Sequence, residues 1–231
     1  MLTMHEVTKE YTLRKRTVRA LDGASVRIAA GDFVSLVGPS GSGKSTLLLM
    51  LGGMLSPTSG EVFLDGTSIY DLNADDRARL RMNHVGFVFQ TFNLVTYLTA
   101  LENVQIALYL AGVGGDEQEE RAARLLQRVG LGDRLDHKPS ELSVGQQQRV
   151  ALARMLANDP AVILADEPTG NLDPQTSAQV IRFFEEFNDE GRTIVMVTHD
   201  PRAAEKARRV LRIADGKIAD ERAGSKPHLV A

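Results

Sequence analysis

The chain has 231 residues, of which 43% are hydrophobic and 25% charged, the composition of an ordinary globular protein with one large domain or two small ones. A net charge of −3 gives no support to a nucleic-acid-binding surface, which usually carries a basic excess, and the absence of cysteine excludes disulfides and thiolate metal sites. The N-terminus does not resemble a signal peptide, and the longest nearly unbroken apolar run, 47–55, is shorter than the about 20 residues that span a bilayer. We therefore expect the protein to act on a membrane only through a partner.

The predicted strands form two groups. The segments 2–8 and 17–30 alternate between apolar and polar residues, which predicts an antiparallel set. Short apolar, β-branched runs then alternate with helical segments, which predicts a parallel sheet covered on both faces. We expect these strands at 32–38, 85–90, 161–167 and 193–200, followed by a hairpin at 209–218 that turns at Asp215-Gly216. Because ligands bind beyond the carboxyl ends of parallel strands, the polar residues that end these runs are candidate site residues.

Residues 98–158 have a helical pattern that glycine and proline divide into three parts. We interpret this region as a helical subdomain inserted into the sheet domain, not as a separate folding unit. The chain is then one domain, 1–231, with a core at about 1–91 and 159–222, a helical insert at about 92–158 and a loose tail at 223–231.

The segment GPSGSGKST, 38–46, matches the phosphate-binding P-loop. Its glycines let successive backbone N–H groups point at phosphate oxygens, and the dipole of the following helix adds to the attraction. We expect Lys44 to reach the β- and γ-phosphates and the Ser45 hydroxyl to coordinate Mg²⁺. A chance match has a probability of about 1 in 100, and this segment also lies between a predicted strand and an apolar helix. The predicted nucleotide site consists of Gly38, Pro39, Ser40, Gly41, Ser42, Gly43, Lys44, Ser45 and Thr46.

Four further polar residues end predicted strands at the same edge of the sheet. Asp166 is placed to hold Mg²⁺ directly or through water, and the adjacent Glu167 points in a different direction and is a candidate general base. Gln90 and His199 end two other strands. Either residue alone has an ordinary interpretation as a surface or capping residue, and the shared position makes both candidates for the site.

The order of these segments resembles that of the ATP-binding cassette (ABC) ATPases. GPSGSGKST, Gln90, LSVGQQQRVALAR, VILADEPTGNLD and VTHD follow one another as in that family, and the similarity covers nearly the whole chain. Finer details, including GFVFQTFNL, LTALENV and LANDP, resemble the LolD/MacB subfamily, whose members power lipoprotein release, export of peptides and macrolides, and related tasks. The resemblance implies an α/β P-loop NTPase fold with a RecA-like core, an N-terminal antiparallel β subdomain and an inserted α-helical subdomain.

The resemblance also implies roles for single residues. Tyr11 would stack on the adenine of ATP, Gln90 would contact Mg²⁺ and the attacking water, and Glu167 would be the catalytic base. His199 would hold the γ-phosphate and the water, and Asp173 would face the other subunit. The implied catalytic residues are Glu167, His199, Gln90 and Lys44, and the implied Mg²⁺ ligands are Ser45, Gln90 and Asp166.

The stretch LSVGQQQR, 142–149, contains no acid, histidine or cysteine that could act as a base or nucleophile. In the family this signature loop closes over the γ-phosphate bound by the opposite subunit of a head-to-tail dimer. Ser143, the N–H of Gly145 and Gln146 would complete that phosphate site at the N-terminus of the following helix. Val144 stands where the family usually has glycine, and a β-branched residue would be strained there if the position required a positive φ. We expect Val144 to point away from the nucleotide.

The implied function is that of a nucleotide-binding subunit that forms an ATP-dependent homodimer and drives a separate transmembrane permease. The cargo of such a LolD/MacB-like complex would be a lipoprotein, a peptide or a lipophilic compound, exported or extracted from the membrane. The subunit would be cytoplasmic, bound to the inner face of the cell membrane through its partner, with Phe92 and Leu94 as candidates for lining the contact groove. Two alternatives stay open. One is an FtsE-like complex that grips a membrane protein without transport, and the other is a soluble ABC ATPase. We expect no nucleic-acid partner.

Overall fold

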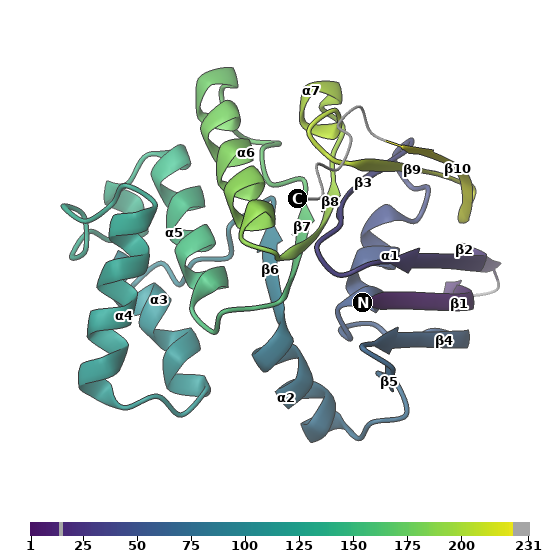
Figure 1. Ribbon diagram of the computed structural model, residues 1–231, viewed down its shortest axis with the longest axis horizontal. Helices are drawn as coiled ribbons and strands as arrows, with labels where there is room; N and C mark the ends of the chain where they lie inside the picture. The colour runs from purple at the N-terminus through teal and green to yellow at the C-terminus, as the bar shows by residue number, and fades with distance from the viewer. Residues whose placement is uncertain (14–15, 224–231) are drawn as a thin grey trace, which may run out of the picture.

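The computed structural model describes residues 1–13 and 16–223, which form two β-sheets and a group of helices (Figure 1). The strands are β1 (Leu2–Leu13), β2 (Arg16–Ile28), β3 (Phe33–Val37), β4 (Ser59–Leu64), β5 (Thr67–Ser68), β6 (Val85–Phe89), β7 (Val162–Asp166), β8 (Thr193–Val197), β9 (Arg209–Ala214) and β10 (Lys217–Ala223). The helices are α1 (Lys44–Leu51), α2 (Ala74–His84), α3 (Ala100–Leu110), α4 (Gly115–Arg128), α5 (Val144–Leu156), α6 (Pro174–Asp189) and α7 (Pro201–Ala204), with a 3-10 turn, η1 (Pro139–Glu141).

The larger sheet has the order β10-β9-β3-β8-β7-β6, in which β9, β3, β8, β7 and β6 are parallel and β10 pairs antiparallel with β9. The smaller sheet, β2-β1-β4-β5, is antiparallel. In Figure 1 the helices α3, α4 and α5 lie at one end of the molecule, the antiparallel sheet at the other, and the parallel strands between them. The predicted parallel sheet and hairpin are therefore confirmed.

The parallel strands are apolar on both faces because each face packs on a different core. In β7, Ile163 and Ala165 pack with the helices, whereas Val162 and Leu164 pack with α1 and the antiparallel sheet. Successive residues of a strand point to opposite faces, so a strand covered on both sides must be apolar throughout. This burial makes the strands rigid supports for the loops at their carboxyl ends.

Three elements have no counterpart in the apolar pattern of the sequence. Helix α2 has no buried residue, so no apolar stripe marks it, and β4 and β5 are short and partly exposed. Strand β1 also continues beyond the predicted 2–8, because residues 9–13, which lack an apolar alternation, pair with the start of β2. The predicted tail at 223–231 lies outside the described residues except for Ala223. In the part of the chain that is described, no helix has both the length and the apolar character to cross a membrane.

Candidate functional site

Four loops meet at the carboxyl edge of the parallel sheet. The strand order places β3, β8, β7 and β6 side by side, and their register sets Leu36 level with Val197, and Asp166 level with both Val197 and Phe89. The next residues along each strand are the predicted site residues. The sheet therefore brings together the phosphate loop, His199, Glu167 and Gln90, in that order along its edge.

The phosphate loop connects β3 to α1, as the sequence predicts. Lys44 is buried, and its ammonium group donates hydrogen bonds to the carbonyl oxygens of Gly38 and Pro39, each at 2.9 Å. Ser45 is exposed, and a hollow of about 160 Å³ beside it is lined by Gly41, Gly43, Lys44, Thr46 and Ala20. The unpaired N–H groups at the start of α1 and a buried cation suit an anionic phosphate chain.

The phosphate loop is held in shape by the hairpin of β9 and β10, which is adjacent to it in space but distant in sequence. A Cβ atom on Gly38 would lie 2.1 Å from the carbonyl oxygen of Ile213 in β9, so only glycine fits there. The N–H of Gly216, at the turn between β9 and β10, donates to the carbonyl oxygen of Ser42 at 3.1 Å. The P-loop pattern gives no sign of this support, which comes from nearly 180 residues later in the chain.

Glu167 lies at the centre of the edge, in a left-handed backbone conformation with φ 49°. Its N–H donates to the carbonyl oxygen of Val197 at 3.0 Å, and its carboxylate accepts from the N–H of His199 at 3.2 Å. The His199 Nε2 atom is 3.1 Å from Glu167 Oε1. Burial raises the pKa of the Glu167 carboxyl above its ordinary value, against the opposing effects of His199 and Lys44. A desolvated carboxylate with a raised pKa is a stronger base than an exposed one.

The residues predicted to hold Mg²⁺ supply the oxygen ligands that this ion prefers. They are the Asp166 carboxylate, the Ser45 hydroxyl and the Gln90 side-chain amide. Within the described ranges, no three His, Asp or Glu side chains gather as a ready metal cluster. This donor set fits Mg²⁺ only when phosphate oxygens or water complete the coordination, which is the usual arrangement for a nucleotide-bound Mg²⁺.

The Gln90 loop contacts the loop that follows Glu167. The side-chain amide of Asn171 donates to the carbonyl oxygen of Gln90 at 3.0 Å, and Gln90 Nε2 lies 3.5 Å from Asn171 Oδ1. Asp173, two residues later, caps α6 by accepting from the N–H groups of Gln175 and Thr176. The hydroxyl of Thr176 also donates to this carboxylate and holds the pKa of Asp173 below its ordinary value.

Of the predicted signature loop 142–149, only Leu142 and Ser143 precede α5, and residues 144–149 form the first turns of that helix. Ser143 caps the helix: its hydroxyl accepts from the N–H of Gln146 at 3.3 Å, while the Gln146 side chain accepts from the N–H of Ser143 at 2.8 Å. Val144 is the first residue of α5, has no positive φ, and is 47% exposed, so a valine is unstrained there. Gly145 packs against Thr176 of α6.

Tyr11 lies on β1 and pairs with Val18 of β2. Two residues after Val18 on β2 is Ala20, which lines the hollow beside the phosphate loop. Tyr11 is 36% exposed, and the ammonium group of Lys9 lies 5.3 Å from the centroid of its ring. An exposed aromatic face near a phosphate site is suited to stacking on a base. Of the two candidates for a partner groove, Leu94 packs on the helical core and Phe92 is half-buried.

Three residues that the motifs do not single out join the loops to the helices. Gln148 and Arg154, both on α5, donate to backbone carbonyls beside Glu167 and Gln90 respectively, and Thr176 of α6 contacts Gly145 in the first turn of α5. Gln148 and Arg154 lie within the segment LSVGQQQRVALAR, but the sequence does not distinguish them from the other polar residues of that segment.

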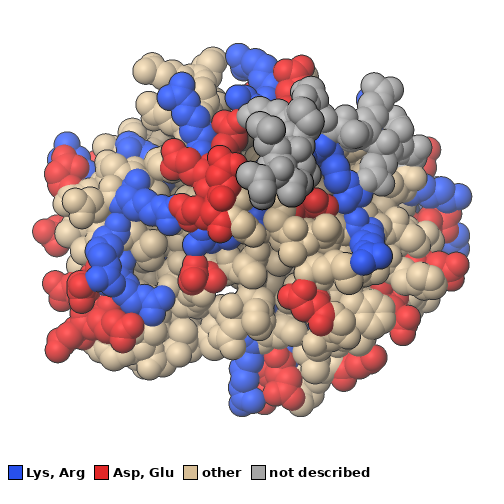
Figure 2. Space-filling model, viewed as in Figure 1, with Lys and Arg blue, Asp and Glu red and all other residues tan. Residues whose placement is uncertain are grey.

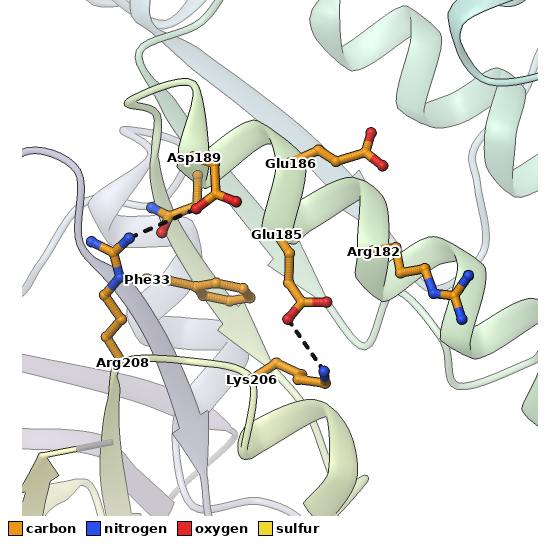
Figure 3. A pocket seen from close by; sticks show the side chains of 8 residues that line it. Phe33, Arg182, Glu185, Glu186, Asp189, Lys206 and Arg208 are labelled. Carbon is orange, nitrogen blue, oxygen red and sulfur yellow. Dashed lines mark ion pairs between the residues drawn. The ribbon is translucent and has the colours of Figure 1, made fainter. Parts of the chain in front are cut away.

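A second hollow, of about 290 Å³, lies at the other edge of the sheet (Figure 3). Phe33, which opens β3, lies between two ion pairs, Glu185–Lys206 at 3.3 Å and Arg208–Asp189 at 3.9 Å. Acidic and basic side chains are similarly intermixed over the face of the molecule drawn in Figure 2. Because Phe33 begins its strand and the phosphate loop follows the strand's end, this hollow is not part of the candidate site.

A phosphate loop between β3 and α1, with an acid pair at the end of β7 in the same parallel sheet, defines the class of P-loop ATPases. The family profile described as ABC transporter matches residues 21–170, and the chain belongs to this family of ATP-binding, ATP-hydrolysing proteins.

Relatives and solved structures agree with this assignment. The chain is 50% identical over 224 residues to the macrolide export ATP-binding/permease protein MacB of Syntrophobacter fumaroxidans, an alignment that covers 96% of this chain and 31% of that protein. It is 45% identical over 228 residues to the ABC transporter ATP-binding protein YvrO of Bacillus subtilis, covering 99% of this chain and 100% of YvrO. The dimeric ATP-binding cassette MJ0796, solved with ADP and Pi, superimposes with a TM-score of 0.91 at 42% identity, covering 96% of this chain and 98% of that one. The chain thus spans about a third of MacB and nearly all of the other two.

Proposed function

We propose that this protein is the nucleotide-binding subunit of a MacB-like ABC complex, in which two copies close on ATP and drive a transmembrane permease. The observation that carries this proposal is the separation of two half-sites within one chain. The phosphate loop opens α1, whereas the capped N-terminus of α5 belongs to the helical end of the molecule, and β6, β7 and α6 lie between α1 and α5 (Figure 1). Each half needs a second copy of the chain to be completed.

In the proposed dimer, Ser143, Gly145 and Gln146 of one subunit face the γ-phosphate held by Lys44 of the other. The solved dimer of MJ0796 with ADP and Pi supports this assembly. The N–H groups at the start of α5 are oriented for an anion, and Asp173 lies close to them through Thr176. Since residues 142–149 include no acid or histidine, their contribution is binding and orientation.

Within one subunit, Glu167 takes a proton from the attacking water, and His199 holds this carboxylate and the γ-phosphate in place. Lys44 offsets the charge that develops on the transferred phosphoryl group. Ser45, Asp166 and Gln90 would hold Mg²⁺, which when bound neutralises phosphate charge. Tyr11 stacks on the adenine.

We infer the membrane partner from the names of the relatives and from the exposed residues beside the Gln90 loop. The name of the MacB relatives combines ATP-binding with permease, and this chain corresponds to about a third of their length. A permease on a separate chain would bind beside the Gln90 loop, where Phe92 is half-buried and Tyr97 is 74% exposed. The complex would then hold this subunit at the cytoplasmic face of the cell membrane. The cargo is a lipoprotein, a peptide or a lipophilic compound.

The decisive experiment compares wild type, Glu167→Gln and Lys44→Ala. We expect wild type to hydrolyse ATP, Glu167→Gln to bind ATP and accumulate as a dimer with hydrolysis reduced by about 10²-fold or more, and Lys44→Ala to lose nucleotide affinity. Sedimentation velocity with ATP or ADP measures the dimer. Glu167→Gln with unchanged turnover would remove Glu167 from the base role, and ATP-independent sedimentation would contradict the composite site.

The membrane partner is tested with the same variant. Glu167→Gln is used with ATP and Mg²⁺ to capture proteins from detergent-solubilised membranes, and a captured permease is reconstituted in liposomes with the wild-type subunit. ATP-dependent movement of a cargo supports transport. ATPase stimulation without movement favours an FtsE-like complex, and capture of soluble proteins alone contradicts a membrane role.

A further inference from the structure

A hydrogen bond with no role in the proposed mechanism joins α5 to the turn that carries Glu167. The side-chain amide of Gln148 donates to the carbonyl oxygen of Pro168 at 2.7 Å. Gln148 is 0% exposed, and its Oε1 atom has no hydrogen-bond partner. Burial removes the hydration of the glutamine amide, and a single hydrogen bond offsets only part of this loss of stability. A buried glutamine with one bond therefore suggests that this bond has a function.

The turn at Glu167 needs such a restraint. Glu167 adopts φ 49°, a conformation that is unfavourable for a residue with a side chain, especially before proline. The turn is closed by the N–H of Gly170, which donates to the carbonyl oxygen of Glu167 at 3.0 Å. Because the proline ring fixes its own φ, the position of the Pro168 carbonyl is closely tied to the orientation of Glu167.

We propose that Gln148 is a positioning residue for Glu167, holding the Glu167–Pro168 turn so that the carboxylate keeps its place at the edge of the sheet. Gln148 is fully buried, so it acts on the site through the Pro168 carbonyl and not by direct contact with the substrate. Gln148 belongs to α5, the helix that Ser143 caps. A shift of α5 would therefore change both the position of Ser143 and the restraint on Glu167. This inference rests on the proposed function, in which Glu167 is the base and α5 contacts the opposite subunit's ATP.

The test separates the hydrogen bond from packing. Gln148→Met keeps the volume of the side chain but has no donor, so we expect kcat to fall about tenfold or more while KM for ATP changes less than about threefold. Gln118→Met is the matched control, since Gln118 also donates to a backbone carbonyl, that of Val113 on the helical side, at 2.6 Å. We expect the control to leave kcat unchanged.

Gln148→Glu tests whether the hydrogen bond itself matters, through the pH dependence of kcat. A purely structural role of Gln148 would not produce this pH dependence. Burial raises the pKa of the new carboxyl, and only its protonated form can donate to the Pro168 oxygen. The ratio of the variant's kcat to that of wild type should therefore be near one at low pH and fall as pH rises, whereas the ratio for Gln148→Met should be low throughout. Measuring ratios removes the titration of Glu167 itself.

The outcomes are distinguishable from those of the proposed function. If wild type does not hydrolyse ATP, the proposed function fails. If wild type hydrolyses ATP and Gln148→Met keeps its kcat, or the Gln148→Glu ratio does not vary with pH, the inference is overturned. Should Gln148→Met not fold, the pH dependence of Gln148→Glu decides alone.

Discussion

Gly145 and Thr176 are in contact across the junction of α5 and α6. A Cβ atom on Gly145 would lie 2.5 Å from Thr176 Cγ2, and Thr176 in turn donates its hydroxyl to Asp173. The loop proposed to bind the opposite subunit's ATP is therefore held against the loop that ends in Asp173. The close approach of the two helices, rather than backbone conformation, requires a glycine at this position.

This contact predicts a rescue. Gly145→Ala should destabilise the protein by about 1–3 kcal/mol, because the added methyl group overpacks against Thr176. In a Thr176→Ser background the clashing methyl is gone and the hydroxyl to Asp173 is kept, so Gly145→Ala should be nearly neutral. Urea unfolding of the wild type, the two single variants and the double variant without nucleotide measures the coupling. Equal destabilisation in both backgrounds would show that the contact is not responsible.

The raised pKa of Glu167 predicts two pH effects. Hydrolysis requires the ionised carboxylate, so kcat should decline on acidification through a pKa above the ordinary glutamate value. For stability the sign is opposite. The folded state binds this proton more tightly than the unfolded chain, so the contribution to stability is present below the unfolded pKa of 4.5 and is lost as pH rises through the folded pKa.

Glu167→Gln removes the loss of stability that ionisation of Glu167 causes as the pH rises. We expect the variant to unfold at a higher temperature than wild type near neutral pH, with the difference shrinking as the pH falls towards and below the unfolded value. Thermal unfolding without nucleotide across this range checks the sign. A difference that is the same at every pH would mean that desolvation of Glu167 is not its cause.

Arg154 holds the loop after Gln90. Its guanidinium group donates to the carbonyl oxygens of Phe92 and Asn93, both at 2.7 Å, and both residues have positive φ, 57° and 50°. Arg154→Met should destabilise the protein by about 1–3 kcal/mol and speed amide hydrogen exchange at 91–95. Arg154→Lys should not restore protection, because one ammonium group does not reproduce the planar fork.

The matched control for this prediction is Arg149 on the same helix. Its guanidinium group donates to the carbonyl oxygens of Val129 and Gly130, at 3.0 and 3.3 Å. Arg149→Met should therefore speed exchange near 129–131 and leave the loop after Gln90 protected. Loss of protection at both places in both variants would point to general loosening of α5.

The phosphate loop offers a comparison between two glycines. Gly38→Ala places a methyl group against the Ile213 carbonyl, a backbone contact that cannot yield, and should destabilise the nucleotide-free protein by about 3 kcal/mol or more. Gly41→Ala meets no atom within 4 Å and is strained only by its φ of +78°, which should cost about 1–2 kcal/mol. Equal values in urea unfolding would contradict the role of the hairpin.

The sequence by itself determined the class of fold and the residues of the candidate site. The parallel strands are apolar throughout because both faces are covered, so they are visible in the chain, and their polar ends mark the edge where Lys44, Glu167, Gln90 and His199 meet. Helix α2 and the second half of β1 escaped prediction, because neither buries a regular apolar stripe.

Only the tertiary structure decided how the site is held. Ile213 against Gly38, Gln148 beneath Pro168, Arg154 on Asn93 and Thr176 against Gly145 are contacts between segments far apart in the chain. Each of these contacts involves a backbone atom or a glycine, and such contacts leave no periodic pattern in the sequence. The local sequence therefore identifies the candidate reacting groups, whereas packing across the sheet and helices sets their positions.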